Sequence, residues 1–203
     1  MSKKRTIDLG SRDRDANHKL LSSLVIPRPI AWVTSMSPSG QPNAAPFSYF
    51  NLFGTQPPMA IIGVGNRPDG SPKDTAANIT ATRHYVINLA EEPTGAAMNA
   101  CATVLPPEQS ELEAFGIATV PASCIDVPMI AKARANLECQ LIEERLYGEN
   151  RILVGEILAV HVAEDIYDAE RNYILDAYQP LGRMSGARYI RTADRFKLER
   201  PDL

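Results

Sequence analysis

The chain has 203 residues, of which 44% are hydrophobic and 22% are charged, and its formal net charge is -3. This composition is typical of a folded globular protein and excludes an intrinsically disordered one, while the length suits one domain with a core that is stable without disulfides. Because no net positive charge is present to attract a phosphate backbone, we expect no nucleic acid among the partners.

The cysteines, the histidines and the N-terminal sequence indicate the cellular compartment of the protein and whether it holds disulfides or a metal. The three cysteines are widely spaced with no CxxC pair, and the three histidines stand apart, so we expect neither a disulfide framework nor a metal site. The N-terminal stretch "MSKKRTIDLGSRDRD" is charged and no apolar run approaches the roughly 20 residues that span a bilayer. We therefore expect a cytoplasmic protein with no signal peptide and no membrane partner.

The first third of the chain indicates a β domain. Residues 1–18 are polar and mixed in charge, which predicts a polar N-terminal arm, followed by a single domain over residues 19–203. Residues 30–35 are rich in β-branched and aromatic side chains and predict a strand. After the turn cluster "SPSGQPN", residues 43–51 ("NAAPFSYFN") predict one further strand that pairs with it as a hairpin. The apolar run at residues 59–65 predicts a strand buried on both faces.

Short helices are expected between the next strands. Asp74 is placed to cap a helix that runs to about Arg83, and residues 84–90 ("HYVINLA") predict a strand. Thr94 can cap a helix that ends near Cys101, and residues 106–116 have the composition of another helix.

The last third contains a strong hairpin signal. "ANLECQLIEERLY" and "RILVGEILAVHVAEDIY" flank the turn "GEN". The second of these strands is apolar on both faces, which a sheet with one solvated face would not be, so we expect one face to line a barrel and the other to meet a helix or a partner subunit. The predicted fold class is mainly β with short helices, an antiparallel sheet closed into a barrel or split barrel.

Several familiar catalytic motifs are absent. "GVGNRPDG" begins like a dinucleotide fingerprint, but Pro68 occupies the position that needs the third glycine. "GNRPDGSPKD" has the glycine spacing of a phosphate loop, but Ser71 and Pro72 stand where Lys and Ser or Thr are required. The chain also lacks a GxSxG elbow and an HExxH motif, which excludes the usual nucleotide hydrolysis and hydrolase sites.

The stretch "PFSYFN" does not segregate polar from apolar side chains. Strand alternation would put Phe47, Tyr49 and Asn51 on one face and Ser48 and Phe50 on the other. The segment is therefore either an ordinary half-buried strand or a strand that presents its backbone and hydroxyls to a flat ligand.

A second candidate stretch is "SPKDTAANI". Lys73 precedes the expected helix start, and Thr75 and Asn78 fall in its first turn, where free amides and a partial positive charge suit a phosphate. Asp74 argues against this role if its carboxylate faces the anion, and the alternative is a capped helix with an exposed lysine. Arg28 lies between two prolines that hold it extended, which suits a phosphate-binding arginine, although a solvated loop arginine is the alternative.

Taken together, the motifs resemble one family. "IPRPIAWVTS", "GxxNxAPFSYFN", "PPxxxxG", "KDTxxNI", the strand "YVINL" and the closing "PLGRMSGARYI" resemble the flavin reductase-like proteins of the FMN-binding split-barrel group, over roughly residues 20–195. The resemblance implies a six-stranded Greek-key split barrel, a homodimer, and FMN in a groove near the dimer interface. It implies no catalytic side chain, because the flavin carries the redox chemistry.

The resemblance also assigns cofactor-binding residues. At the isoalloxazine it implies Thr34, Phe47, Ser48 and Asn51. Around the ribityl-phosphate it implies Lys73, Asp74, Thr75 and Asn78, with Arg28 as a further candidate. Arg183 and Tyr189 match the closing segment and would reach the site from either subunit.

The function that follows from the resemblance is an FMN-binding oxidoreductase. We expect an NAD(P)H-dependent flavin reductase that passes hydride from NADH or NADPH to the flavin, with a small-molecule substrate and a partner monooxygenase as candidate partners. Two alternatives stay open: an FMN-dependent oxidoreductase or oxygenase that acts on a small organic molecule, and a flavin-binding protein without turnover.

Overall fold

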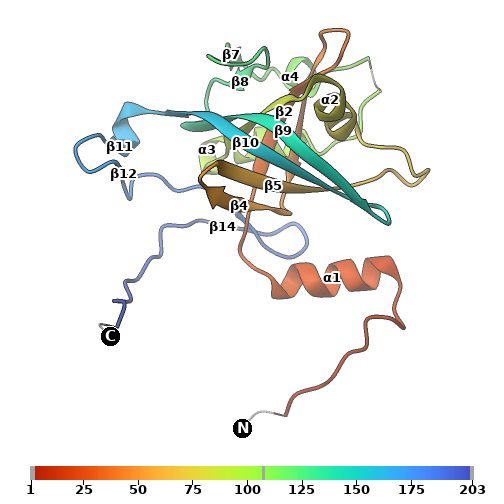
Figure 1. Cartoon of the computed structure of the whole chain (residues 1–203). Coiled ribbons are helices and arrows are strands. Elements are labelled where there is room, and N and C mark those ends of the chain that lie inside the picture. Colours follow the sequence, from red (N-terminus) through yellow and green to blue (C-terminus); the bar gives the residue numbers. More distant parts are fainter. Residues whose placement is uncertain (1–2, 107, 202–203) are drawn as a thin grey trace.

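A computed structural model describes residues 3–106 and 108–201 (Figure 1). Its main feature is a seven-stranded sheet in the order β3-β2-β6-β9-β10-β5-β4, in which every neighbouring pair is antiparallel. The strands, in chain order, are β2 (Ala31–Met36), β3 (Pro42–Phe47), β4 (Phe50–Thr55), β5 (Pro58–Gly65), β6 (His84–Leu89), β9 (Ala135–Tyr147) and β10 (Asn150–Val162). The predicted fold class, mainly β with antiparallel strands and short helices, is confirmed.

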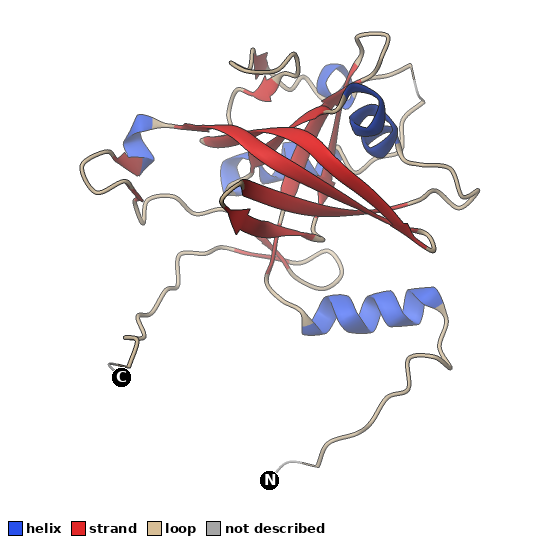
Figure 2. Ribbon diagram, viewed as in Figure 1, coloured by secondary structure: helices blue, strands red, loops and turns tan. Residues whose placement is uncertain are grey.

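Short helices and small sheets surround this sheet (Figure 2). The helices are α1 (Arg14–Leu24), α2 (Asp74–Thr82), α3 (Glu92–Ala100), α4 (Glu111–Ala114) and the 3-10 helix η1 (Glu164–Ile166). The short strands are β1 (Arg28–Pro29), β7 (Thr119–Val120), β8 (Met129–Ile130), β11 (Tyr167–Asp168), β12 (Tyr173–Ile174), β13 (Gly182–Arg183) and β14 (Tyr189–Ile190). Because β13 pairs with both β1 and β14, the end of the chain returns to the segment that precedes β2.

Two hydrophobic clusters lie on opposite faces of β2. Alternate residues of β2 enter each cluster, as the period of a strand requires: Val33 belongs to the cluster enclosed by the sheet, and Trp32 to the cluster beneath α3 and α4. Gly155 on β10 is required by the first cluster, since a Cβ there would lie 2.0 Å from the Tyr85 hydroxyl oxygen. The expectation that β5 is buried on both faces is wrong, because only its alternate residues, such as Ile62, are fully buried.

The predicted strand over residues 43–51 is wrong as a single element. β3 ends at Phe47, and β4 starts at Phe50 on the opposite edge of the sheet, which gives seven strands where the resemblance implies six. The bend between them is held by contacts distant in sequence. Arg28 donates from Nε to the Ser48 hydroxyl over 3.3 Å, and the Tyr49 carbonyl accepts a hydrogen bond of 2.6 Å from the Gly63 amide.

Helix boundaries differ from the sequence prediction at their N-termini. The helix predicted from Asp74 is confirmed as α2, but Lys73 is its N-cap and Asp74 is its first helical residue. The helix α1 begins at Arg14, inside the segment expected to be a polar arm, because the Asp13 side chain accepts a hydrogen bond from the Ala16 amide over 2.7 Å and caps it.

The two helices predicted next also start elsewhere. Thr94 is the third residue of α3 rather than its N-cap, and it forms a capping box with Glu91. The helix predicted over residues 106–116 is reduced to the four residues of α4.

The hairpin of β9 and β10 is confirmed, and its two faces differ in burial. Leu153 and Ile157 of β10 point into the enclosed cluster. Leu158 and Val160 on β10 are 40% and 58% exposed, and Ile142 on β9 is 50% exposed. One face therefore lines the barrel, as expected. The sequence left a helix or a partner subunit as the cover of the other face, and among the described residues no helix covers Leu158 and Val160.

A buried carboxylate fastens a loop to this hairpin. Glu138 on β9 is fully buried and accepts hydrogen bonds from the Ser123 hydroxyl, the Ser123 amide and the Cys124 amide, each over 2.7 Å, and from His161 Nε2 over 2.5 Å. Burial alone raises the pKa of Glu138, but the hydrogen bonds from Ser123, His161 and Cys124 outweigh it and lower the pKa to about 2.

This pKa predicts an acid-dependent loss of stability. The contribution of Glu138 is complete above about pH 4.5, its ordinary value, and disappears as the pH falls towards about 2. We expect the free energy of unfolding of the Glu138→Gln variant, measured in urea, to have a shallower pH slope in this range, by up to about 1.4 kcal/mol per pH unit. The exposed Glu113→Gln variant is the control, and equal slopes in the two variants would contradict the assignment.

Candidate functional site

The candidate site extends along the outer edge of strand β3. β3 is an edge strand, and the Ala44 amide points away from β2 because it donates a hydrogen bond of 3.1 Å to Oε2 of Glu111. In an antiparallel ladder, residues two apart point the same way, so Pro42 and Pro46 occupy outward positions where they lack an N–H. The free edge is therefore rich in carbonyl acceptors and suits a ligand that carries N–H or hydroxyl donors.

A cavity of about 170 Å³ lies where β3 ends, and we call it the β3-end cavity. It brings together four of the predicted site residues, Phe47, Ser48, Arg183 and Tyr189, all from one chain. Ile30, Pro46, Met98, Asn99 and Ala102 complete its lining. The Tyr189 hydroxyl donates to Oδ1 of Asn99 over 2.8 Å, and the Arg183 guanidinium lies 4.6 Å from the centre of the Tyr189 ring, which fixes both side chains.

Arg28 connects this cavity to three segments of the chain. Its guanidinium is buried and donates to the Ser48 hydroxyl, to the carbonyls of Ser22 and Val25 at the end of α1, and to the carbonyl of Met184. These bonds use four of the five N–H groups of an arginine. The solvated loop arginine that the sequence left open is therefore wrong, and Arg28 positions Ser48 and the closing segment.

The N-terminus of α2 lies at the other end of β3, beside a cavity of about 190 Å³ that Asp74 and Asn78 line. Lys73 is exposed and supplies no side-chain cap to the helix. The Asp74 carboxylate forms an ion pair of 2.6 Å with Arg67, so its charge is balanced by a neighbouring cation. The arrangement removes the main objection to an anion at this helix end.

Thr75 and Asn78 tie α2 to the sheet. The buried Thr75 hydroxyl accepts a hydrogen bond of 3.0 Å from Asn43 on β3, and Asn78 donates to the Ser35 hydroxyl on β2 over 3.3 Å. Glu111 also lines this cavity, and burial raises its pKa although the Ala44 amide lowers it. A phosphate is therefore favoured at the helix end beside Lys73, and disfavoured next to the Glu111 carboxyl group.

Five of the predicted residues line neither of these two cavities: Arg28, Lys73 and Thr75 lie beside residues that do, whereas Thr34 and Asn51 make their contacts elsewhere. Thr34 is fully buried on β2, where its hydroxyl donates to the Pro128 carbonyl over 2.6 Å and accepts a hydrogen bond from Asn88 over 3.2 Å. Asn51 lies on β4 at the far edge of the sheet, and its side-chain oxygen accepts a hydrogen bond of 2.9 Å from the Leu52 amide. Because the chain bends between β3 and β4, Ser48 lines the β3-end cavity whereas Asn51 lines a different one.

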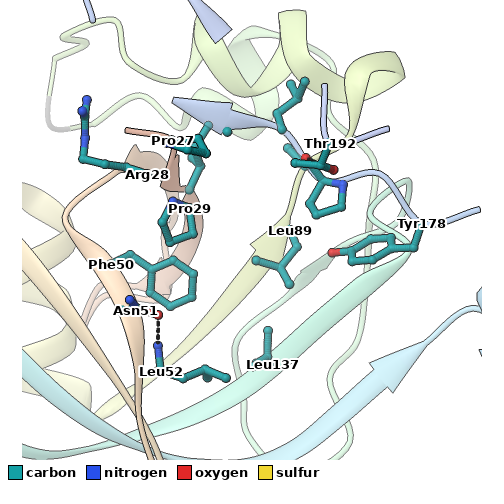
Figure 3. Close-up of a pocket in the computed structure, with 15 residues that line it drawn as sticks. Pro27, Arg28, Pro29, Phe50, Asn51, Leu52, Leu89, Leu137, Tyr178 and Thr192 are labelled. Atoms are coloured by element: carbon teal, nitrogen blue, oxygen red, sulfur yellow. Dashed lines mark hydrogen bonds between the residues drawn. The ribbon is translucent and has the colours of Figure 1, made fainter. Parts of the chain in front are cut away.

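Asn51 lines a larger, mostly apolar cavity of about 440 Å³ (Figure 3). The walls come from segments far apart in the sequence, namely β1, the start of β4, the end of β6, β9 and the residues that lead into β13. The lining residues are Pro27, Arg28, Pro29, Ile30, Phe50, Asn51, Leu52, Leu89, Ala90, Leu137, Tyr178, Pro180, Leu181, Gly182 and Thr192.

Sequence reasoning missed several residues of these sites. Asn99 and Glu111 are polar residues in unremarkable helical stretches, and only their contacts with Tyr189 and Ala44 reveal their roles. Tyr178 had no local motif around it. Three of the sequence motifs contribute to the lining of the larger cavity, namely the prolines around Arg28, the end of "PFSYFN" and the start of "PLGRMSGARYI", but none of them indicated a cavity.

Within residues 3–106 and 108–201, no group of three or more His, Cys, Asp or Glu side chains is arranged to hold a metal ion. In the same described part of the chain, no helix combines the length and the apolar character needed to cross a membrane.

Comparison with known proteins gives a consistent result. A protein of Bacillus subtilis without assigned function is 38% identical over 191 residues, which are 91% of this chain and 93% of that protein. The crystal structure of 2-nitrobenzoate 2-nitroreductase from Pseudomonas fluorescens superposes with a TM-score of 0.90 at 35% identity and covers 97% of this chain and 96% of that one. Nitrilotriacetate monooxygenase component B from Bacillus cereus superposes with a TM-score of 0.92 at 30% identity and covers 98% and 100%.

A further structural neighbour, from Shewanella frigidimarina, is described as a putative flavin reductase with a split barrel domain, and its TM-score of 0.83 at 19% identity shows the shared fold. The family model of the flavin reductase like domain matches residues 22–182. With an antiparallel sheet of split-barrel type and this match over most of its length, the chain belongs to the flavin reductase-like family.

Proposed function

We propose that this protein binds FMN along the edge of β3 and works as an NAD(P)H-dependent flavin reductase. The proposal rests on the surroundings of the edge strand β3. The N-terminus of α2, with Lys73, lies at one end of this strand, and the β3-end cavity lies at the other end. From Asn43 beside α2 to Phe47 at the β3-end cavity is a path of four residues, or about 13 Å. That span suits an extended ligand with a ring at one end and a phosphate at the other.

The residues of the chain would bind and orient the cofactor. Lys73 and the amides of the first turn of α2 would hold the phosphate, and Arg67 would keep the Asp74 carboxylate neutralised. The carbonyl-rich edge of β3 would accept hydrogen bonds from the ring and the ribityl chain. When bound, the flavin supplies the hydride chemistry, with NADH or NADPH as the proposed donor. Direct flavin contacts of Thr34 and Asn51 stay predictions, since neither residue lines the cavities at the ends of β3.

Similar proteins support two kinds of electron acceptor. One similar structure is described as a component of a monooxygenase, which supports a flavin reductase that serves a partner monooxygenase. Another is described as a nitroreductase that acts on 2-nitrobenzoate, which supports the alternative of direct reduction of a small organic molecule. The large apolar cavity beside the β3-end cavity is the observation that favours the second possibility.

A purified sample mixed with FMN and then with NADH or NADPH under anaerobic conditions tests the proposal. We expect flavin absorption bands that bleach with one of the two donors. Flavin bands that resist both donors would favour the flavin-binding protein or an enzyme with another reductant. A protein that takes up no flavin would contradict the proposal.

Phosphate binding at α2 predicts a selective effect of Lys73→Ala. Because a charged hydrogen bond to the phosphate is lost, we expect FMN affinity to fall roughly tenfold, which is about 1.4 kcal/mol, while riboflavin affinity changes little. Calorimetric titration with both ligands measures the difference. Lys132→Ala, which removes another exposed lysine, is the matched control, and equal losses for FMN and riboflavin in Lys73→Ala would defeat the assignment.

We also propose a homodimer that covers the outer face of the hairpin. Besides Leu158 and Val160, Leu52 and Phe53 on β4 are 61% and 65% exposed, an amount of exposed apolar surface that a partner subunit would bury. We expect a mass twice the 22.2 kDa of the chain by light scattering, and a shift towards 22.2 kDa in Val160→Asp. Phe196→Asp changes an equally apolar residue that is 85% exposed on the C-terminal segment and should leave the mass unchanged. A monomeric parent protein would contradict this proposal.

A further inference from the structure

Tyr178 presents an unused hydrogen-bond donor to the apolar cavity of about 440 Å³. Among the described residues, its hydroxyl is buried and has no hydrogen-bond partner. Figure 3 shows the hydroxyl at the cavity wall, pointing towards Leu89. Burial, reinforced by the negative charge of Glu91, raises the pKa of Tyr178 well above its usual value, so the group stays protonated at neutral pH. A buried hydroxyl without a partner is costly, which makes an acceptor in the cavity favourable.

The direction of Tyr178 is fixed by contacts of both its neighbours. Arg134 donates from Nη2 to the Ala177 carbonyl over 2.8 Å and to Oε1 of Glu91 over 2.6 Å. The same Glu91 oxygen accepts a hydrogen bond of 2.8 Å from the Gln179 amide. Burial raises the pKa of Glu91, but the hydrogen bonds from Arg134 and Gln179 outweigh it, so the carboxylate that anchors this segment stays ionised. The backbone on both sides of Tyr178 is therefore held in place, which limits the positions that its side chain can reach.

Of the other polar side chains of the lining, Arg28 and Thr192 donate to protein acceptors, and Asn51 is exposed. Arg28 points away from the cavity in Figure 3, and four of its N–H groups are bound by protein acceptors. Thr192 donates its hydroxyl to the Pro180 carbonyl over 2.9 Å. Asn51 is exposed, and its side-chain oxygen is turned to the Leu52 amide. With the one cation of the lining already satisfied, the cavity favours an uncharged ligand over an anion.

The cavity is a neighbour of the proposed flavin site. Ile30 lines both this cavity and the β3-end cavity, and the Arg28–Ser48 hydrogen bond joins their walls. A molecule held against Tyr178 would thus lie next to a flavin in the β3-end cavity, a relation that rests on the proposed function. The binding itself rests only on the cavity and on Tyr178.

We propose that this cavity is the binding site for an uncharged, mainly apolar organic molecule, with a ring and one carbonyl-type oxygen that accepts the hydrogen bond of Tyr178. The volume of about 440 Å³ admits a small ring compound, and the apolar wall of Leu89, Leu137 and Phe50 favours a hydrocarbon body. The site defines the class of organic substrate that the oxidoreductase would take.

The test is an NMR titration of the full-length, nitrogen-labelled protein with 4-fluoroacetophenone, which follows the fluorine signal of the ligand and the backbone amide signals of the protein. We expect saturable binding, with amide shift changes at Leu89, Leu137 and Leu181. In Tyr178→Phe the affinity should fall about fivefold, the effect of one neutral hydrogen bond. Tyr173→Phe removes the same atom from a tyrosine that is 61% exposed and outside the lining, and it should bind as the parent does.

Two further probes separate the hydrogen bond from mere burial. 1-Ethyl-4-fluorobenzene lacks the carbonyl, so we expect it to bind the parent and Tyr178→Phe equally, which also shows that the variant is folded. 4-Fluorobenzoate is an anion and should bind more weakly than the ketone. The inference is overturned if Tyr178→Phe binds the ketone unchanged, if the benzoate binds as tightly, or if the shifted amides lie outside the lining.

The titration is run with and without FMN, so that the proposed ketone site and the proposed flavin function can each be refuted independently of the other. Flavin uptake without binding of the ketone would overturn the ketone site and leave the proposed function intact. Ketone binding at the lining residues in a protein that takes up no flavin would keep the site and overturn the proposed function.

Discussion

The buried guanidinium of Arg28 is the interaction on which the candidate site depends. It joins the end of α1, the bend after β3 and the carbonyl of Met184, three segments that share no secondary structure with one another. Charge-assisted hydrogen bonds of this kind are stronger than neutral ones, and the loss of the guanidinium would leave several acceptors without their partner. Because Ser48 and the strand that carries Arg183 are both held by Arg28, the β3-end cavity takes its shape from this side chain.

The second constraint is the position of β3 at the edge of the sheet. Prolines at residues 42 and 46 remove outward N–H groups from this edge, and Glu111 binds the one at Ala44 between them. These features discourage the addition of another strand and leave carbonyl groups available. The same strand ends at α2 on one side and at the β3-end cavity on the other, so one edge links the proposed phosphate and ring positions.

Much of the fold could be predicted from the sequence, because β2, β5, β6 and the β9–β10 hairpin are encoded by local residue patterns and turn residues. The bend at Ser48 and Tyr49 could not be predicted, because the local pattern is compatible with a continuous strand. Arg28 and Gly63, which hold the bend, lie 20 and 14 positions away from their partners Ser48 and Tyr49.

The candidate site was predictable to the extent that its residues fall in contiguous motifs. Lys73 to Asn78 and Phe47 to Ser48 were found this way, and they flank the two ends of β3. Thr34 was assigned to the flavin, yet its hydroxyl bonds to Pro128, a contact between segments 94 residues apart. The cavity beside Tyr178 could not be found, because its walls meet only after the C-terminal segment has paired with β1.

The most direct test of this account is a crystal structure of the protein grown with FMN. We expect the isoalloxazine at the β3-end cavity, beside Ser48 and Tyr189, with the phosphate at the N-terminus of α2 within hydrogen-bond distance of Lys73. A ring bound in the large cavity against Tyr178, or a phosphate bound away from α2, would contradict it.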